Sequence, residues 1–222
     1  MIGKVVMENQ KIINALRFYL LATSLKDKIR SGWKIWHVSK ERLESVAEHI
    51  YGTCILAISI ESEFELNLNL DKCISMLVLH ELEEIVIGDL TPFDKITKEE
   101  KRAKGQEAVK KVLASLAKKD DYFNLLQEFE EEKTLESRFA RMCDKLECDI
   151  QVKLYCERNE VDLFADSNKY LSEIPEIKSR IFLEKSRNLA DLFIENDRVY
   201  FKNEEIEKVV DFVKNNSLLE LI

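Results

Sequence analysis

Residues 79–90 read LHELEEIVIGDL and place one histidine beside carboxylates in an otherwise apolar stretch. Apolar side chains also precede and follow it, which predicts a helix that is buried on most faces and ends near Gly88. A buried carboxylate without a partner is costly, whereas a divalent cation turns it into a ligand. At about 100° per residue, His80 and Glu81 are neighbours on the helix surface, and Glu84 lies one turn after His80. The spacing therefore fits a metal site.

A second interpretation of this stretch stays open. A single histidine in a helix is more often a hydrogen-bonded core residue than a ligand, and glutamates at a helix end usually face solvent. Asp89 follows Gly88, a residue suited to a helix C-cap, and so emerges at the rim of the cleft that His80 and Glu84 face. Other parts of the chain must decide between the two.

Composition favours an all-α protein. The 222 residues include 5 Gly and 2 Pro, with 45% hydrophobic and 34% charged residues, as expected for long helices joined by short loops. This length suits one domain with a large core. Strands have little support in the pattern.

Charge and cysteine usage exclude several classes of protein. The net charge of −8 argues against binding to a nucleic-acid polymer, although local cations are compatible with a small phosphorylated substrate. The 5 cysteines form no C-x-x-C pair and are expected to be reduced thiols in a cytoplasmic protein. No apolar run approaches the length needed to cross a membrane.

Hydrophobic periodicity and capping residues predict the positions of the helices. Ser45 to Glu48 and Thr97 to Glu100 have the form of capping boxes, and Asp71 is a candidate N-cap. The predicted helices span about residues 8–28, 45–63, 71–88, 97–119, 122–132, 135–158, 177–194 and 204–215.

The segment 30–38 holds both tryptophans without a sustained period and is predicted to be a loop. Paired tryptophans in a loop are more often a hydrophobic plug than a stacking surface. The functional alternative is that a Trp face takes a base or sugar, with Arg30 near a phosphate.

Two further polar residues carry alternative interpretations. His49 lies in the first turn of its helix, where hydrogen bonding to a neighbouring loop is the simpler role. Asp144 lies one turn from Ala140 and Cys148, a row of small residues. Its carboxylate either pairs with a nearby cation, such as Lys145, or crosses the bundle as a metal ligand.

Three motifs follow one another along the chain: Arg42-x-Glu44-Ser45-Val46-Ala47-Glu48-His49, then Leu79-His80-Glu81 through Glu84 to Gly88-Asp89-Leu90, then Met142-Cys143-Asp144-Lys145. In this order and separation they resemble the HD-domain metal-dependent phosphohydrolases, especially the branch of 5′-deoxyribonucleotidases. The likeness runs from about Leu16 to Tyr155. It implies a multi-helix HD-domain bundle as one domain over residues 1–222, with a core at about 10–158 and a C-terminal helical extension at about 159–222.

The resemblance also implies roles for individual residues. The metal ligands would be His49, His80, Glu81 and Asp144, holding one divalent ion whose identity (Co, Mn, Mg, Zn or Fe) the sequence does not fix. Glu84 and Asp89 match the catalytic acid pair, of which one activates the attacking water and the other protonates the leaving nucleoside oxygen, in an order the sequence does not assign. Trp33 and Arg42 match the deoxyribose and phosphate end of the pocket, and Arg30 is a looser substrate-binding candidate.

Two departures from the family pattern bear on activity. The name-giving His-Asp pair is here His80-Glu81, and the longer carboxylate is still an oxygen ligand for hard and borderline metals. The segment between Trp33 and His49 is about two residues longer than expected, and Gly32 stands where some relatives place Arg. The second departure bears on substrate identity.

Three functions are therefore carried forward. The leading one is a phosphomonoesterase that hydrolyses (deoxy)nucleoside 5′-monophosphates to nucleoside and phosphate. The second is a catalytically degenerate HD domain that binds a nucleotide or metal as a sensor or scaffold, and the third is a structural interaction module. The resemblance further implies a homodimer, for which the first helix and the helix at 177–194 are candidate interfaces.

Overall fold

Helices and connecting loops make up the described part of this computed structural model, residues 2–91, 93–172 and 186–222. In chain order the α-helices are α1 (Ile2–Thr23), α2 (Ser31–Ile35), α3 (Val46–Phe64), α4 (Leu70–Leu79), α5 (Glu84–Ile87), α6 (Lys98–Leu113), α7 (Lys119–Glu131), α8 (Leu135–Glu157), α9 (Lys169–Ser172), α11 (Leu189–Asp197) and α12 (Glu204–Asn215). Short 3₁₀ turns span Ser24–Asp27, Asp166–Asn168 and Leu219–Leu221. Within these ranges, β-type pairing is limited to an isolated antiparallel bridge between Ile29 and Ser45. The all-α prediction is confirmed.

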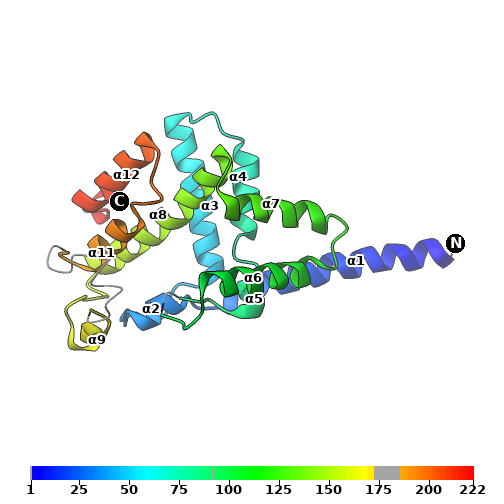
Figure 1. Ribbon diagram of the computed structural model, residues 1–222, viewed down its shortest axis with the longest axis horizontal. Helices are drawn as coiled ribbons and strands as arrows, with labels where there is room; N and C mark the ends of the chain where they lie inside the picture. Colours follow the sequence, from blue (N-terminus) through cyan, green and yellow to red (C-terminus); the bar gives the residue numbers. More distant parts are fainter. Residues whose placement is uncertain (1, 92, 173–185) are drawn as a thin grey trace.

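The long helix α8 lies at the centre of the bundle, with α3, α4, α7, α11 and α12 packed against it (Figure 1). The main core cluster joins Ala57 of α3, Met76 of α4, Leu146 of α8 and Val210 of α12, all of which are 0% exposed. Burial of this apolar surface is the main force that fixes the relative positions of these helices. The same packing brings their polar side chains together.

The structure confirms several of the predicted helix starts. Ser45 and Thr97 form the predicted capping boxes with Glu48 and Glu100. The N-cap of α4 is Asn69, whose side chain accepts the Lys72 N–H, so the prediction that Asp71 caps this helix is wrong. The helix at 204–215 has the predicted bounds.

The central helix is shorter than predicted. It ends at Leu79 instead of continuing to Gly88, and a turn separates it from α5. The Leu82 N–H bonds the Leu79 carbonyl and the Glu84 N–H bonds the Glu81 carbonyl, so the hydrogen bonds through the turn span three residues. Gly88 then adopts φ 79° and ψ 168°, a region that is essentially restricted to glycine and lies outside the left-handed helical region.

Other boundaries also differ from the predictions. The first helix ends at Thr23 and is followed by the 3₁₀ turn at Ser24–Asp27, and the segment predicted as a loop contains the short helix α2. The helix predicted over 97–119 ends at Leu113. Of the helix predicted at 177–194, residues 177–185 lie outside the described residues, and α11 begins at Leu189. The division into a core and a C-terminal extension stays a prediction.

Both tryptophans of the segment 30–38 are buried. Trp33 is 2% exposed and Trp36 is 5% exposed. The Trp33 ring packs edge-on against Tyr155 at 5.2 Å between ring centroids, and both tryptophans contact Phe193. This arrangement agrees with the plug interpretation, since the indoles fill a core between the loop, α8 and α11.

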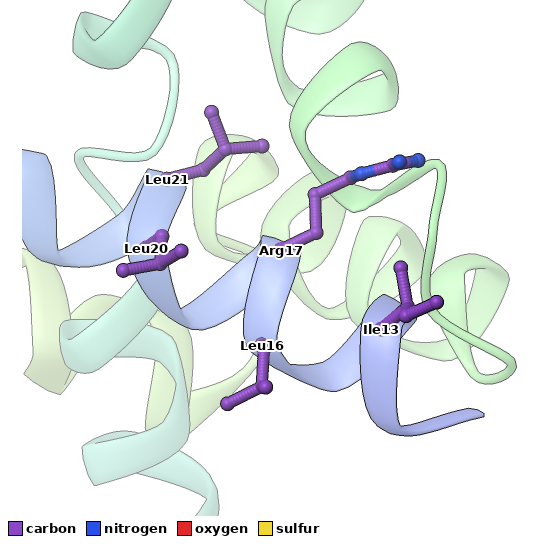
Figure 2. Close-up of a pocket in the computed structure, with 5 residues that line it drawn as sticks. All are labelled: Ile13, Leu16, Arg17, Leu20 and Leu21. Atoms are coloured by element: carbon purple, nitrogen blue, oxygen red, sulfur yellow. The ribbon is translucent and has the colours of Figure 1, made fainter. Parts of the chain in front are cut away.

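The N-terminal part of α1 extends beyond the other helices (Figure 1). Its exposed apolar side chains include Ile12, Leu16, Tyr19 and Leu20. A pocket on this helix is lined by Ile13, Leu16, Arg17, Leu20 and Leu21 (Figure 2). No helix among the described residues has the length and apolar character of a membrane span.

Candidate metal centre

Four potential metal ligands meet where α3, α8 and the turn after α4 come together. They are His49, His80, Glu81 and Asp144, and one ligand atom from each lies within 4.8 Å of all the others. The His49 Nε2 atom is 3.1 Å from Asp144 Oδ1 and 3.8 Å from Glu81 Oε1. The His80 Nε2 atom is 3.3 Å from the same glutamate oxygen and 3.5 Å from the same aspartate oxygen.

Each ligand is placed by a local feature of the backbone. The capping box at Ser45 starts α3 so that His49 falls in its first turn, where it is fully buried. The break in the helix after Leu79 puts His80 and Glu81 on a turn, and the side chain of Glu81 remains 19% exposed. Asp144 lies midway along α8 and is 4% exposed.

The orientation of His80 fits a metal ligand. Its Nδ1–H donates to the Leu77 carbonyl at 2.6 Å, which directs the Nε2 atom into the cluster. Within the described part of the chain, this buried Nε2 atom has no partner in hydrogen-bond geometry, although the carboxylate oxygens of Glu81 and Asp144 lie within 3.5 Å. Two imidazoles and two carboxylates suit a borderline or hard divalent cation. The residues present therefore fit the ion that the motifs imply.

The surroundings of Asp144 fit both of the alternatives that the sequence left open. Its Oδ1 atom faces the two histidines, while its Oδ2 atom lies 3.1 Å from Lys145 Nζ and 3.3 Å from Arg141 Nη1. Burial opposes the charged form, but Lys145 and the histidines outweigh it and hold the pKa of Asp144 well below its usual range. The carboxylate is thus kept ionised for a ligand role.

Without a metal ion, a proton on His80 offsets the negative charge of the cluster. Burial lowers the pKa of His80, but the negative charges of Glu81 and Asp144 prevail and raise it to about 10. Burial likewise opposes ionisation of Glu81, and His80 reverses that effect and lowers the pKa of Glu81. Because these two shifts describe one ion pair, a metal that binds here competes with the His80 proton.

The predicted acid pair lies beside the cluster. Glu84 is 7% exposed, and its Oε2 atom has no hydrogen-bond partner among the residues described. Burial raises the pKa of Glu84, and the neighbouring charges of Glu81 and Asp89 raise it further. Asp89 is half-buried and accepts the backbone N–H of Ser31. Their assignment as catalytic acids stays a prediction.

Trp33 is buried, and the other two predicted substrate residues, Arg42 and Arg30, differ in exposure. Arg42 is 71% exposed in its side chain and pairs with Glu48. Arg30 is mostly buried, lies 3.5 Å from Glu44 and 3.7 Å from Glu147, and stands 5.5 Å from the ring centre of Trp33. Their roles in binding a substrate stay predictions.

Sequence reasoning assigned no role to two glutamates beside the site. Glu44 accepts the indole N–H of Trp33 at 2.8 Å, and Glu147 pairs with His49 Nδ1 at 2.5 Å. Glu147 lies one turn after Asp144 on α8, so the i, i+3 spacing was a signal that both face the same histidine.

Comparison with known proteins identifies the family to which this chain is similar. The family model described as HD domain matches residues 22–186. The 5′-deoxynucleotidase HDDC2 of Homo sapiens is 30% identical over 184 residues, which cover 79% of this chain and 88% of that protein. The Mus musculus protein of the same name is 31% identical over 182 residues and covers 79% of this chain and 89% of its own length.

Solved structures share the fold. A predicted metal-dependent phosphohydrolase from Magnetospirillum magnetotacticum MS-1 aligns with a TM-score of 0.63 at 17% identity and covers 95% of this chain and 94% of its own. An HD-domain phosphohydrolase from Listeria innocua aligns with a TM-score of 0.55 at 18% identity, covering 93% and 99%.

Proposed function

This chain belongs to the HD-domain family, and from that membership we propose that it hydrolyses deoxynucleoside 5′-monophosphates to nucleoside and phosphate. The relatives named 5′-deoxynucleotidase HDDC2 align over most of both chains, which supports the reaction class and the kind of substrate. Proteins that share a fold can catalyse different reactions, so the proposed reaction also depends on the residues of the site.

The observation that carries the proposal is the convergence of four ligand atoms within 4.8 Å of one another. We propose that His49, His80, Glu81 and Asp144 hold one divalent ion. When bound, that ion supplies positive charge to a phosphoryl oxygen and lowers the pKa of water. The exchange of Asp for Glu at position 81 does not disperse the cluster, since the Glu81 oxygen lies 3.3 Å from His80 Nε2.

The remaining chemistry falls to Glu84 and Asp89. Burial and two carboxylate neighbours favour the protonated form of Glu84, so it is suited to give a proton to the leaving nucleoside oxygen. Asp89 is fixed by the Ser31 N–H and is suited to orient the attacking water. This division of roles extends the sequence prediction, which left the order open.

Arg42 is proposed to bind the phosphate end of the substrate, because its guanidinium is exposed and adjacent to the start of α3. Arg30 and Trp33 are proposed to support this binding site. Since Trp33 is 2% exposed, we expect it to act by holding Glu44 and Arg30 in place.

The test is phosphate release from a panel of 5′-deoxynucleoside monophosphates, with Co²⁺, Mn²⁺, Mg²⁺, Zn²⁺ or Fe²⁺ added to metal-free protein. We expect metal-dependent turnover, and ribonucleotides and simple phosphomonoesters serve as comparison substrates. Nucleotide-dependent thermal stabilisation without turnover would instead support a degenerate sensor or scaffold. Protein that binds neither metal nor nucleotide would support a structural module.

We further propose that the protein acts in the cytoplasm as a homodimer. All 5 cysteines are free thiols, which suits a reducing compartment. The apolar side chains around the α1 pocket are exposed in the single chain, which favours an interface there (Figure 2). Light scattering is expected to give twice the chain mass of 26.0 kDa, and a value near 26.0 kDa would reject the dimer.

A further inference from the structure

We propose that Glu147 is a positioning residue that fixes the ring of His49 and keeps the proton on its Nδ1 atom, with Gly52 and Arg30 holding the Glu147 carboxylate in place. This inference rests on the proposed function, because it assigns to His49 the task of presenting Nε2 to the ion. It adds a residue that none of the sequence motifs contains.

The His49 ring has a carboxylate on each side. Nε2 faces Asp144 Oδ1 at 3.1 Å, and Nδ1 faces Glu147 Oε2 at 2.5 Å. A neutral histidine that offers Nε2 to a metal must carry its proton on Nδ1, where a carboxylate is a strong acceptor. Because Asp144 and Glu147 are three residues apart on α8, one helix supplies a carboxylate to each side of the ring.

The two histidines of the cluster are anchored differently. His80 donates from Nδ1 to the Leu77 carbonyl of its own helix. His49 depends on a charged group from another helix, so its orientation follows the packing of α3 against α8. A carboxylate partner on Nδ1 also makes the imidazole a more basic metal ligand than a carbonyl partner does.

Gly52 provides the space for this arrangement. It lies on α3 three residues after His49, on the same face, and a Cβ atom placed there would stand 2.4 Å from Glu147 Oε1 and 3.0 Å from Cδ and Cγ. The clash falls on the end of a flexible side chain. An alanine at position 52 is therefore expected to displace the carboxylate and leave the fold intact.

Arg30 balances the charge of the carboxylate. Its Nη1 atom lies 3.7 Å from Glu147 Oε2 and 3.5 Å from Glu44 Oε2, and Glu44 also accepts the Trp33 indole N–H. The side chain of Glu147 is 11% exposed, so an uncompensated charge there would be costly. Arg30 is thereby linked to His49 through two ion pairs, Arg30–Glu147 and Glu147–His49.

The experiment compares Glu147→Gln and Gly52→Ala with Glu157→Gln. The control removes a carboxylate of similar exposure from the same helix, one that accepts the backbone N–H groups of Leu218 and Leu219 far from the cluster. Metal-free protein is titrated with Mn²⁺ or Co²⁺ by calorimetry. We expect both test variants to lose roughly 10- to 100-fold in metal affinity, the usual cost of losing a partner of a ligating histidine. The control is expected to stay within about twofold of the wild type, since it leaves that partner in place.

A second readout needs neither metal nor substrate. Imidazole ¹⁵N NMR of metal-free protein is tractable because the chain has 3 histidines, and His37→Asn and His80→Gln assign the signals. We expect a slowly exchanging His49 Nδ1 proton in the wild type, moved upfield in Glu147→Gln and Gly52→Ala. A general loss of packing would not move this proton selectively.

The outcomes separate this inference from the proposed function. Unchanged metal affinity and an unchanged His49 signal in folded Glu147→Gln or Gly52→Ala protein would overturn the role of Glu147. So would a wild-type His49 without a proton on Nδ1, a result that holds even when a variant fails to fold. Wild-type protein that binds metal and shows the Nδ1 proton but releases no phosphate would refute the proposed function alone.

Discussion

The Nε2 atom of His49 lies 3.1 Å from Oδ1 of Asp144, although 95 positions separate the two residues. The capping box that starts α3 and the burial of α8 at the centre of the bundle bring them together. Because the second oxygen of Asp144 pairs with Lys145, only one oxygen is turned to the histidines. The site is thus a product of helix packing more than of any single motif.

Glu81→Asp tests whether the longer carboxylate is adapted to this site. The shorter side chain withdraws its oxygen by about 1.5 Å, one C–C bond, from a position 3.3 Å from His80 Nε2. We therefore expect weaker metal binding and lower turnover, even though the substitution restores the His-Asp pair. Calorimetry and phosphate release measure the two effects.

Glu81→Gln is the matched variant, since it keeps the length and removes the charge. It is expected to bind metal more weakly than the wild type. Glu81→Asp protein that binds metal more tightly and turns over faster would mean that Glu81 marks a degenerate site.

Glu84→Gln and Asp89→Asn are expected to separate catalysis from metal binding. Neither residue belongs to the four proposed ligands, so the metal content of both variants should equal that of the wild type. Loss of a positioned acid or base typically costs about 10²- to 10⁴-fold in rate, and we expect losses of that size in kcat. Full activity in either variant would remove that residue from the catalytic pair.

Stability of the metal-free protein is expected to depend on the proton held by His80. Glu81 and Asp144 raise its pKa from 6.5 to about 10 against the effect of burial. The folded state then keeps a proton that the unfolded state releases, so this stabilisation is complete below pH 6.5 and is lost as the pH rises towards 10. The free energy of unfolding should fall with pH in this window, by at most about 1.4 kcal/mol per pH unit from this group.

Urea unfolding of metal-free protein at several pH values measures the slope. His80→Gln should flatten it, because the variant lacks the titrating group. The same slope in the wild type and His80→Gln would show that other groups control the pH dependence. The raised pKa of His80 and the lowered pKa of Glu81 describe the same ion pair, so its contribution to the free energy of unfolding is counted once.

Trp33→Phe should destabilise the fold. The substitution removes the indole N–H that Glu44 accepts at 2.8 Å and leaves a buried carboxylate with one donor fewer, at a cost of about 1–3 kcal/mol. Trp36→Phe makes the same change of ring size at a second buried tryptophan and serves as the control. An unchanged free energy of unfolding with a raised KM would show that Trp33 contacts the substrate directly.

Much of the fold follows from local signals in the sequence. Ser45 and Thr97 start their helices as predicted, because each cap is satisfied by a glutamate three residues later. The end of the central helix could not be predicted in this way. Residues 80–84 are mostly good helix formers, so propensity favours continuation, whereas the α-helix ends at Leu79.

The cluster of potential metal ligands was accessible to sequence reasoning, and its surroundings were less so. His80 and Glu81 are adjacent in the chain, and the resemblance to a known family linked them to His49 and Asp144. Glu44 and Glu147 gave a weaker signal, because glutamates on helices usually face solvent. Their burial depends on Arg30 and on the absence of a side chain at Gly52, which only the packed helices reveal.

The most direct test of the central claim is the metal content and metal-dependent activity of His80→Ala beside the wild type and His37→Asn. His37 is exposed and has a positive φ of 53°, which Asn tolerates, so the control removes a histidine outside the cluster. We expect near-stoichiometric metal and phosphate release from deoxynucleoside monophosphates in the wild type and control. His80→Ala should lose more than the roughly 10- to 100-fold affinity that an outer partner provides, and turnover with it. Equal metal content and activity in all three proteins would contradict the account.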